Sequence, residues 1–530
     1  MKCRYLPFGL AFILLLLIPG LDRFSTAQAA ADAVDRGKSR QESQRSFRQT
    51  PALPVAEAGK VTLSVEQAVM LALHNNRDLQ VRQLTPVIVG RFEEIERGRF
   101  DPELFAEIES FEERSSETSR SSGEQFNVSG SETGGIAGIR QDLPSGTTLE
   151  ATIEQQRSIS NRAPEQQTAR VGLSVTQSLL HGFGPAVNLA SVRQAELETR
   201  ASIHELRGFT EAMLADAEIA YWHYVLAGDE IAIFEESLNL ARRQLEEIEL
   251  RIDVGLLPEI EVAAARAEVA LREQALIDAR SQLEERRLRL LRLINPGGEA
   301  RFDLQVAAVS EPDIEPETIT NLRERLSLAE QARADLAEAR LRLRQNRLET
   351  VVTRNGMLPR LDLFIALGEA GYANTFGESL RDIDGNTYDL SVGVRLSHFL
   401  GNRAAEARNL AAYASRRQAA EAIANLRQLV HLDVRLAVNE VERTRQQIDA
   451  SRATRVFQEQ TLNAEKERFD VGSSTALQVA QAQRDLLRAR IAEVEAVVNY
   501  RQAMVRLALA EGSLLERRGI RLDERGVGLD

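Results

Sequence analysis

The side chains that most often carry out chemistry in proteins are present in this chain, but they are not grouped. Cys3, the single cysteine, precedes an apolar run and is expected to leave with it, so no thiol remains for a disulfide, a thiolate metal site or a nucleophile. None of the six histidines lies at a metal-ligand spacing from another histidine or a cysteine: His74, His181, His204, His223, His398 and His431. We expect no enzyme, cofactor or metal site.

The acidic residues are also poor candidates for catalysis. They lie along stretches with arginine three or four residues away, which is typical of exposed helix faces. Gly182-Phe183-Gly184 lacks the rest of a phosphate-binding loop. The formal net charge of −13 argues against a nucleic-acid partner. With 27% charged and 5% aromatic residues, the composition indicates extended helices.

The N-terminus has the features of an export signal. Lys2 and Arg4 precede the apolar run 10–18, and small residues follow at 27–29 with the spacing of a cleavage site. The run is too short to span a bilayer comfortably, so residues 1–29 are interpreted as a signal peptide, with an uncleaved anchor as the alternative. The polar segment 30–60 follows it. No run of about 18 apolar residues exists, but an exported chain can still cross a membrane as β-strands.

An internal duplication organises the remaining sequence. At a numbering offset of 217, Leu173-Ser174-Val175 recurs as Leu390-Ser391-Val392, and segment 251–255 recurs at 468–472. Upstream the offset is 257, as between Pro102 and Pro359, so the first copy has an insertion of roughly 40 residues between Leu104 and Leu173. We predict a first repeat at 61–296, a linker at 297–316, a second repeat at 317–513 and a C-terminal tail at 514–530.

Each repeat is predicted to contain strands followed by two long helices. Residues 388–397 alternate strictly between apolar and polar, which fits a tilted transmembrane strand or a half-buried strand of a soluble sandwich. Strands are predicted at 104–110, 170–180, 358–367 and 387–396. The insertion adds a possible hairpin, 135–141 with 147–154. Helices are predicted at 186–253, 259–294, 402–470 and 473–511, and they are too long for one globular core.

The number of strands limits what one chain can form. Four to six strands cannot close a membrane barrel, which needs about eight, and an open sheet edge in lipid leaves unpaired backbone groups. If the strands lie in a membrane, several chains must share one barrel, with the helices continuing it as a tube.

The chain resembles TolC-like outer-membrane efflux proteins over about residues 61–513. The resemblance rests on the opening stretches 63–68 and 72–76, on 177–184, and above all on two duplicated segments, 251–256 and 468–473. It implies a mainly α-helical protein with a membrane β-barrel: a homotrimer whose twelve strands form the barrel and whose twelve helices form a periplasmic tunnel. The implied partners are outer-membrane lipid, a periplasmic adaptor protein and an inner-membrane transporter, in efflux or type I secretion.

Two groups of residues acquire roles from this resemblance. The tips that would meet the adaptor are Arg251, Asp253, Val254, Gly255 and Leu256, and Arg468, Asp470, Val471, Gly472 and Ser473. Alternatively, the glycines only reverse the chain, and the charged residues are either gate ion pairs or solvated helix ends. The gate positions are Glu261, Gln478 and Gln481; the glutamines stand where the family often has aspartate, which puts cation selectivity in doubt.

Two other classes of protein fit parts of the pattern. A periplasmic adaptor is also exported and also contains a coiled hairpin, but it would have a single hairpin flanked by small β-domains. A soluble coiled-coil scaffold would not need ten-residue alternating strands. The duplicated strand–helix units therefore favour the export channel.

Overall fold

The computed structural model describes residues 60–118, 121, 123–161, 163–296, 302–312, 316, 318–383 and 387–520. The predicted signal peptide 1–29, the segment 30–59, parts of the linker and residues 521–530 of the tail lie outside the described residues. The chain divides into two compact units, Met1–Thr62 and Leu63–Asp530, and strand β1 (Lys60–Leu63) begins in the first. The architecture that follows is that of the second unit.

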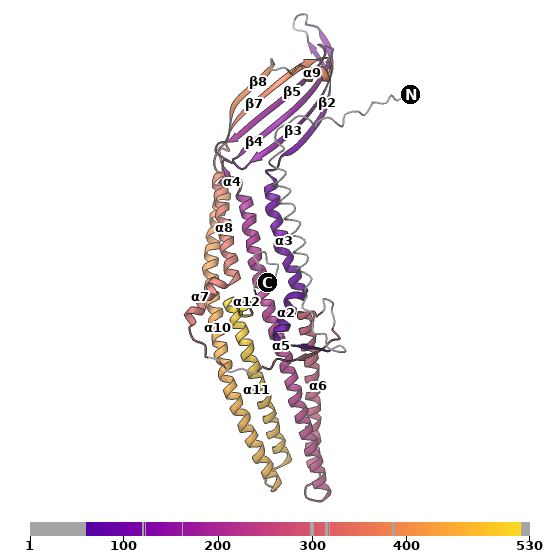
Figure 1. Cartoon of the computed structure of the whole chain (residues 1–530), viewed down its shortest axis with the longest axis vertical. Helices are drawn as coiled ribbons and strands as arrows, with labels where there is room; N and C mark the ends of the chain where they lie inside the picture. The colour runs from indigo at the N-terminus through magenta and orange to yellow at the C-terminus, as the bar shows by residue number, and fades with distance from the viewer. Residues whose placement is uncertain are drawn as a thin grey trace, which may run out of the picture. The chain divides into compact units, whose positions relative to one another are not determined.

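Six strands of this unit form one sheet (Figure 1). Its spatial order is β2-β3-β4-β5-β7-β8, and every neighbouring pair is antiparallel. The four predicted strands and the predicted hairpin are all present, several of them longer than the alternation indicated. The strands are β2 (Glu103–Thr118), β3 (Gln125–Leu143), β4 (Thr147–Ser160), β5 (Ala163–Ser178), β7 (Arg360–Ala373) and β8 (Tyr388–Ser397).

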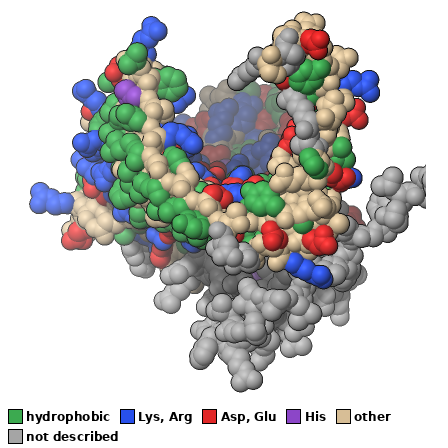
Figure 2. All heavy atoms as spheres, turned by 90° about the horizontal axis from the view of Figure 1, so that it is seen from above, with side chains coloured by type: hydrophobic (Ala, Val, Ile, Leu, Met, Phe, Trp, Pro, Cys, Tyr) green, Lys and Arg blue, Asp and Glu red, His purple; other side chains and the backbone are tan. Residues whose placement is uncertain are grey.

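A row of apolar residues crosses the whole width of the sheet on one face. Side chains alternate between the two faces of a strand, so cross-strand partners share a face. One such row of partners consists only of apolar residues: Leu104, Ile139, Ala151, Leu173, Leu367 and Leu390. Leu104 and Leu390, on the two edge strands, are 80% and 61% exposed. In Figure 2 hydrophobic side chains gather on the outer side of the curved sheet.

The opposite face is charged. Arg140 Nε of β3 donates to Glu150 Oε2 of β4 at 2.7 Å. Arg170 of β5 pairs with Glu154 at 3.1 Å and, across β7, with Asp389 at 2.8 Å. Charged side chains line the hollow that the sheet surrounds (Figure 2). The sheet therefore separates an apolar exterior from a charged interior.

Long helices lead into and out of the strands. The N-terminal helix pair of each repeat leads into its first strand: α2 (Val65–Asn75) and α3 (Arg77–Gly98), then α7 (Leu322–Ala332) and α8 (Ala334–Asn355). The predicted long helices are confirmed with slightly shorter bounds: α5 (Ala190–Asp253), α6 (Glu261–Ile294), α10 (Arg403–Asp470) and α11 (Ala476–Glu511). The remaining elements are short: α4 (Pro185–Asn188), β6 (Gln305–Ala308), α9 (Phe376–Arg381) and α12 (Leu514–Arg517).

The helices pack as a row that stays open at both ends. Near the sheet, α3 packs on α5, α5 on α8 and α8 on α10; further away, α6 packs on α5, α5 on α11 and α11 on α10. Buried clusters hold the row together, including one formed by Val441, Ile448 and Tyr500 between α10 and α11. Among the described residues, none of the helices combines the length and apolarity that a membrane span requires.

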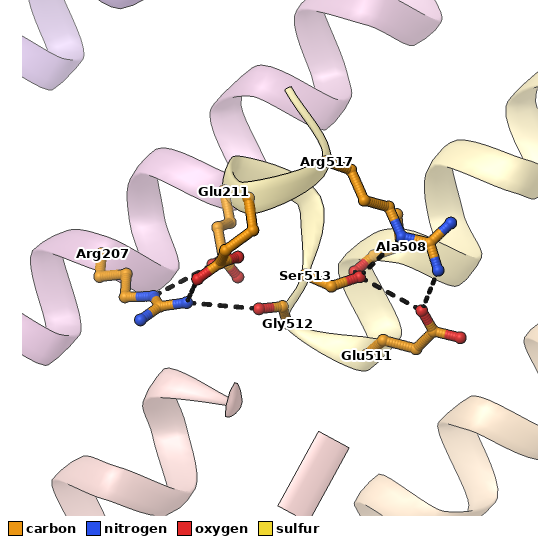
Figure 3. A network of polar contacts seen from close by, with 8 residues as sticks. Arg207, Glu211, Ala508, Glu511, Gly512, Ser513 and Arg517 are labelled. Carbon is orange, nitrogen blue, oxygen red and sulfur yellow. Dashed lines mark hydrogen bonds and ion pairs between the residues drawn. The ribbon is translucent and has the colours of Figure 1, made fainter. Parts of the chain in front are cut away.

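The first residues of the predicted tail are packed rather than free. Leu514 and Leu515 of α12 are 2% and 3% exposed. Arg207 of α5 donates to Glu516 Oε1 at 2.6 Å and to the Gly512 carbonyl at 3.4 Å. Figure 3 shows the contact of Arg207 with the Gly512 carbonyl beside those of Arg517, whose Nη2 donates to Glu511 Oε2 at 2.6 Å. The segment after α11 thus ties the second repeat to α5 of the first.

Candidate functional site: the helical hairpin tips

The two hairpins end in turns of the same construction. In each, the glycine lies in the left-handed region, with φ of +74° at Gly255 and +75° at Gly472. Gly255 N donates to the Ile252 carbonyl at 2.8 Å, and Leu256 N donates to the Arg251 carbonyl at 2.8 Å. This pair of hydrogen bonds satisfies the last carbonyls of a helix and requires a residue free to adopt positive φ.

The second tip repeats this pattern at the equivalent positions of the second repeat. Gly472 N donates to the Phe469 carbonyl at 3.0 Å, and Ser473 N donates to the Arg468 carbonyl at 2.8 Å. Arg251, Asp253 and Val254 thus hold the same positions in their turn as Arg468, Asp470 and Val471 in theirs. The duplicated sequence therefore folds into a duplicated turn.

An ion pair joins the two tips of one chain. Arg251 Nη2 lies 2.7 Å from Asp470 Oδ1 and 2.5 Å from Glu247 Oε1, and its guanidinium stacks 5.3 Å from the centre of the Phe469 ring. Hydrogen bonding to Asp470 raises the pKa of Arg251 above its ordinary value. Its repeat equivalent, Arg468, pairs within its own helix with Glu465 at 2.8 Å. The two arginines therefore make different contacts.

Apolar residues at the extreme end of both tips remain uncovered in the single chain. Val254 and Leu256 are 69% and 73% exposed at the first tip, and Val471 is 78% exposed at the second. Behind them, Ile248, Ala265 and Ala476 form a buried cluster on which the partly buried Phe469 packs. A packed cluster therefore lies behind a small exposed apolar surface at the end of the two hairpins.

The two returning helices begin differently. Helix α11 begins at a capping box, in which the Thr475 hydroxyl accepts from Gln478 N and the Gln478 side chain accepts from Thr475 N. Gln478 Oε1 also accepts from Ser474 Oγ at 2.7 Å. Helix α6 has Ile260 at this position and no side-chain cap. Sequence reasoning assigned Gln478 only to a gate, whereas the structure also gives it this capping contact.

The three positions predicted to form a gate lie near the starts of the returning helices. Glu261 is the first residue of α6, and Gln478 and Gln481 lie in the first two turns of α11. Within the described part of the chain, no hydrogen bond or ion pair joins Glu261 to either glutamine. Gln478 and Gln481 are exposed, and Glu261 is partly buried.

A buried charge cluster beyond the tips escaped sequence reasoning. Glu268 and Arg272 of α6 pair at 2.5 Å with their side chains 6% and 7% exposed, and Arg484 of α11 reaches Glu268 at 3.0 Å. Burial lowers the pKa of Arg272. The spacing of Glu268 and Arg272 resembles that of the many exposed helical pairs, so nothing in the sequence marked these two as buried. The cluster joins one hairpin to the other.

Metal binding has no support in this region or elsewhere in the described chain. Among residues 60–520, apart from the gaps given above, no three His, Cys, Asp or Glu side chains are arranged to hold an ion.

Several solved structures share this fold. The Campylobacter jejuni CmeC outer membrane channel is 17% identical, with a TM-score of 0.62, over 85% of this chain and 86% of that one. The outer membrane protein VceC from Vibrio cholerae is 16% identical, with a TM-score of 0.61, over 84% and 96%. The open state of the Neisseria gonorrhoeae MtrE outer membrane channel is 18% identical, with a TM-score of 0.58, over 88% and 97%. No curated protein matches the chain.

The family described as outer membrane efflux protein matches residues 140–296 and 326–513, which is more than half of the chain. The matched segments include the two long helical hairpins with both tips, and strands β4, β5, β7 and β8. The chain belongs to the outer membrane efflux protein family.

Proposed function

We propose that the protein is the outer-membrane channel subunit of a tripartite efflux or type I secretion system, a passive exit duct that extends into the periplasm. The observation that carries this function is a sheet with one apolar and one charged face whose edges are open. Such a sheet fits a wall between lipid and water, and it must close on other copies because an open edge in lipid is costly.

Each edge strand of the sheet is connected to a helix at one end of the helix row. Edge strand β2 follows α3, and edge strand β8 precedes α10, the two helices that end the row. Helix α3 carries an exposed apolar stripe that includes Val81, Ile88 and Ile95, which are 68%, 61% and 65% exposed. A neighbouring copy placed against these edges covers the stripe and continues the sheet. A ring of three copies follows the architecture of the family.

Fractionation tests this proposal. We expect the protein in outer membranes as a trimer that runs faster than its unfolded chain on gels unless it is heated. Recovery of a monomer from the aqueous periplasmic fraction would contradict the channel and favour a soluble scaffold.

The hairpin tips are the proposed contact for a periplasmic adaptor, which in turn meets an inner-membrane transporter. Uncovered Val254, Leu256 and Val471 supply apolar surface at the end of firm helices. We expect Val471→Glu to abolish export and cross-linking to the adaptor while leaving trimers intact. Val456→Glu, at a 38% exposed position further up α10, is the matched control. Normal export by the Val471 variant would rule out this contact.

The gate is proposed at the starts of α6 and α11, around Glu261, Gln478 and Gln481. Gln481 is the sharper position to test, because its exposed side chain lies outside the capping box that Gln478 completes. A ring of carboxylates concentrates cations, so Gln481→Asp is expected to raise the cation preference of channels in planar bilayers. An unchanged reversal potential would place the gate elsewhere.

A further inference from the structure

We propose that the hairpin β3–β4, which the first repeat has and the second lacks, is part of the membrane wall, so that three copies close a barrel of 18 strands. This inference rests on the proposed function, because it requires that the sheet lies in a membrane and closes as a trimer. The resemblance alone implied twelve strands, four from each chain. The inserted hairpin raises the contribution of each chain to six.

The hairpin is built into the sheet rather than laid over it. Strand β3 pairs with β2 from Glu103↔Arg140 to Thr118↔Gln125, the whole length of β2. On the other side, β4 pairs with β5 from Thr147↔Gln177 to Ser160↔Ala163. The hairpin therefore lies between the two strands that correspond to β7 and β8 of the second repeat, and it keeps them from pairing with each other.

The hairpin also continues the apolar face. Ile139 of β3 and Ala151 of β4 stand in the row that runs from Leu104 to Leu390. In the adjacent row on the opposite face, Arg140 and Glu150 stand beside Ser174 and Ser391. An external loop needs no such alternation, whereas a wall strand between lipid and water does.

A cross-strand motif of the second repeat recurs where β3 joins the sheet. In the second repeat, Phe364 of β7 lies over Gly393 of β8, where a Cβ would come within 2.5 Å of the ring, and Arg395 stacks on the same ring at 5.6 Å. This contact pins two neighbouring wall strands together, because the ring covers a position without a side chain.

Strand β3 makes the same contact with β2. Phe105 lies over Gly138, where a Cβ would come within 2.8 Å of the ring, and Arg140 stacks on that ring at 4.9 Å. In both pairs the arginine stands two residues after the glycine. The inserted strand thus joins β2 as β8 joins β7.

The hairpin turn is anchored at the junction between sheet and helices. Gly184 N donates to the Ser145 carbonyl at 3.0 Å, and Ser178 N donates to the Gly146 carbonyl at 2.9 Å. Asn188 Nδ2 donates to the Pro144 carbonyl at 3.2 Å and to the Gly182 carbonyl at 2.8 Å. A side chain at Gly146, whose φ is +84°, would collide with the Gly182 carbonyl. The turn is short and lies on the side where membrane barrels have short turns, the periplasmic side.

The geometry of the edges permits closure with this number of strands. Each neighbouring pair in the sheet is antiparallel, so β2 and β8 at the two edges run in opposite directions. The β8 edge of one copy therefore pairs antiparallel with the β2 edge of the next. Because barrel diameter grows roughly linearly with strand number, 18 strands give a barrel about 1.5 times as wide as twelve.

Cysteine accessibility tests the inference, because the only native cysteine is Cys3. Two single-cysteine variants probe the hairpin: Ile139→Cys in the apolar row and Glu150→Cys in the charged row. Leu390→Cys and Ser391→Cys of β8 are the matched controls, since they stand in the same two rows. Each variant is made in a Cys3→Ser background, recovered in outer membranes as heat-modifiable trimer, and exposed to a water-soluble maleimide before and after detergent extraction.

We expect rapid labelling of Glu150→Cys and Ser391→Cys from the lumen. Ile139→Cys and Leu390→Cys should label at least tenfold more slowly in membranes. Rapid labelling of Ile139→Cys with a protected Leu390→Cys would overturn the 18-stranded wall and leave the channel intact. Rapid labelling of Leu390→Cys would overturn the channel itself. Ile153→Cys of β4, which pairs with Val171 on the same face of the sheet, replaces Ile139→Cys if that variant forms no trimer.

Discussion

At the scale of single residues, the hairpin tips depend on backbone conformation more than on side-chain contacts. Gly255 and Gly472 have positive φ, and no atom lies within 4 Å of the place where a Cβ would be. Substitution there meets no steric clash, so its cost comes from the left-handed backbone alone. This property allows the backbone contribution to be measured separately.

Gly472→Ala is expected to destabilise the tip by about 1–2 kcal/mol, because alanine disfavours the left-handed region. Gly228→Ala in α5 is the control: its surroundings are equally open, but its helical backbone suits alanine, which should stabilise by about 0.5–1 kcal/mol. Hydrogen exchange at the tip and the thermal midpoint of the trimer measure both effects. Equal responses would show that the turn does not need glycine.

Buried carboxylates in α5 make stability depend on pH. Burial raises the pKa of Glu211, although Arg207 donates to it at 3.2 Å. Between the ordinary pKa and this raised one the native state holds more protons than the unfolded chain, so stability falls as pH rises through that window. Glu211→Gln removes this pH dependence. As pH is raised from about 4.5, we expect the stability of the wild type to fall relative to that of the variant.

Glu442 of α10 provides a control with the opposite sign. Hydrogen bonds from Arg445 and Gln446 lower the pKa of this exposed carboxylate to about 2. Its contribution is therefore lost as pH falls from the ordinary value toward about 2. As pH rises from 3 to 8, the thermal midpoints should separate from that of the wild type in opposite directions, upward for Glu211→Gln and downward for Glu442→Gln. Parallel curves would contradict the assigned shifts.

At the scale of elements, the two returning helices differ in how they begin. Thr475 caps α11, whereas α6 begins after Ile260 without a side-chain cap. Thr475→Ala should cost about 1 kcal/mol and increase fraying of the first turn of α11, where Gln478 lies. Thr461→Ala, at an exposed position inside α10, is the control. Hydrogen exchange at residues 476–481 reports the fraying, and unchanged exchange would mean that tertiary packing alone holds this turn.

Most helices and strands could be predicted from the periodicity of apolar residues. The constant spacing between the two repeats placed both tips, and α5 and α10 do end at Asp253 and Asp470. The extent of β3 was underestimated because Gly130 and Gly134 interrupt the apolar pattern before the predicted start at Gly135. Pairing with β2 stabilises this glycine-rich part as a strand, although its own strand propensity is low.

Burial through charge pairing was the other limit of sequence reasoning. The sequence predicts a C-terminal tail at 514–530, because these residues are polar and show little periodicity. In the structure Arg518 pairs with buried Glu218, and Arg517 pairs with buried Glu511. Hydrophobic periodicity cannot detect such contacts, because each partner alone reads as solvent-exposed.

At the scale of the whole molecule, the unit Leu63–Asp530 has an open sheet and an open row of helices. Its uncovered surfaces include the edge strands, the apolar stripe on α3 and exposed leucines on α10 such as Leu432 and Leu436. Apolar stripes of this kind on a helix mark surfaces that another chain covers. The proposed ring would supply packing that the single chain lacks.

Ile88→Glu is expected to weaken the trimer, because the stripe on α3 would carry a charge into the contact between copies. Ile88 is 61% exposed in the single chain. Glu94→Lys, on another side of α3, changes charge without touching the stripe. The trimer fraction at rising detergent concentration, measured by mass photometry, should fall at least tenfold for Ile88→Glu alone. Equal dissociation of both variants would mean that α3 does not form the contact.

The turn at residues 144–146 connects strand β3 directly to strand β4, so the inserted hairpin widens the sheet without adding a helix. In the proposed channel, the width of the barrel and the width of the helical tunnel are therefore set by different segments of the chain. In the proposed channel, gaining such a hairpin would widen the external opening and losing it would narrow it, while the tips proposed to meet the adaptor would keep their dimensions. The width of the proposed barrel could accordingly be changed by engineering the β3–β4 hairpin alone.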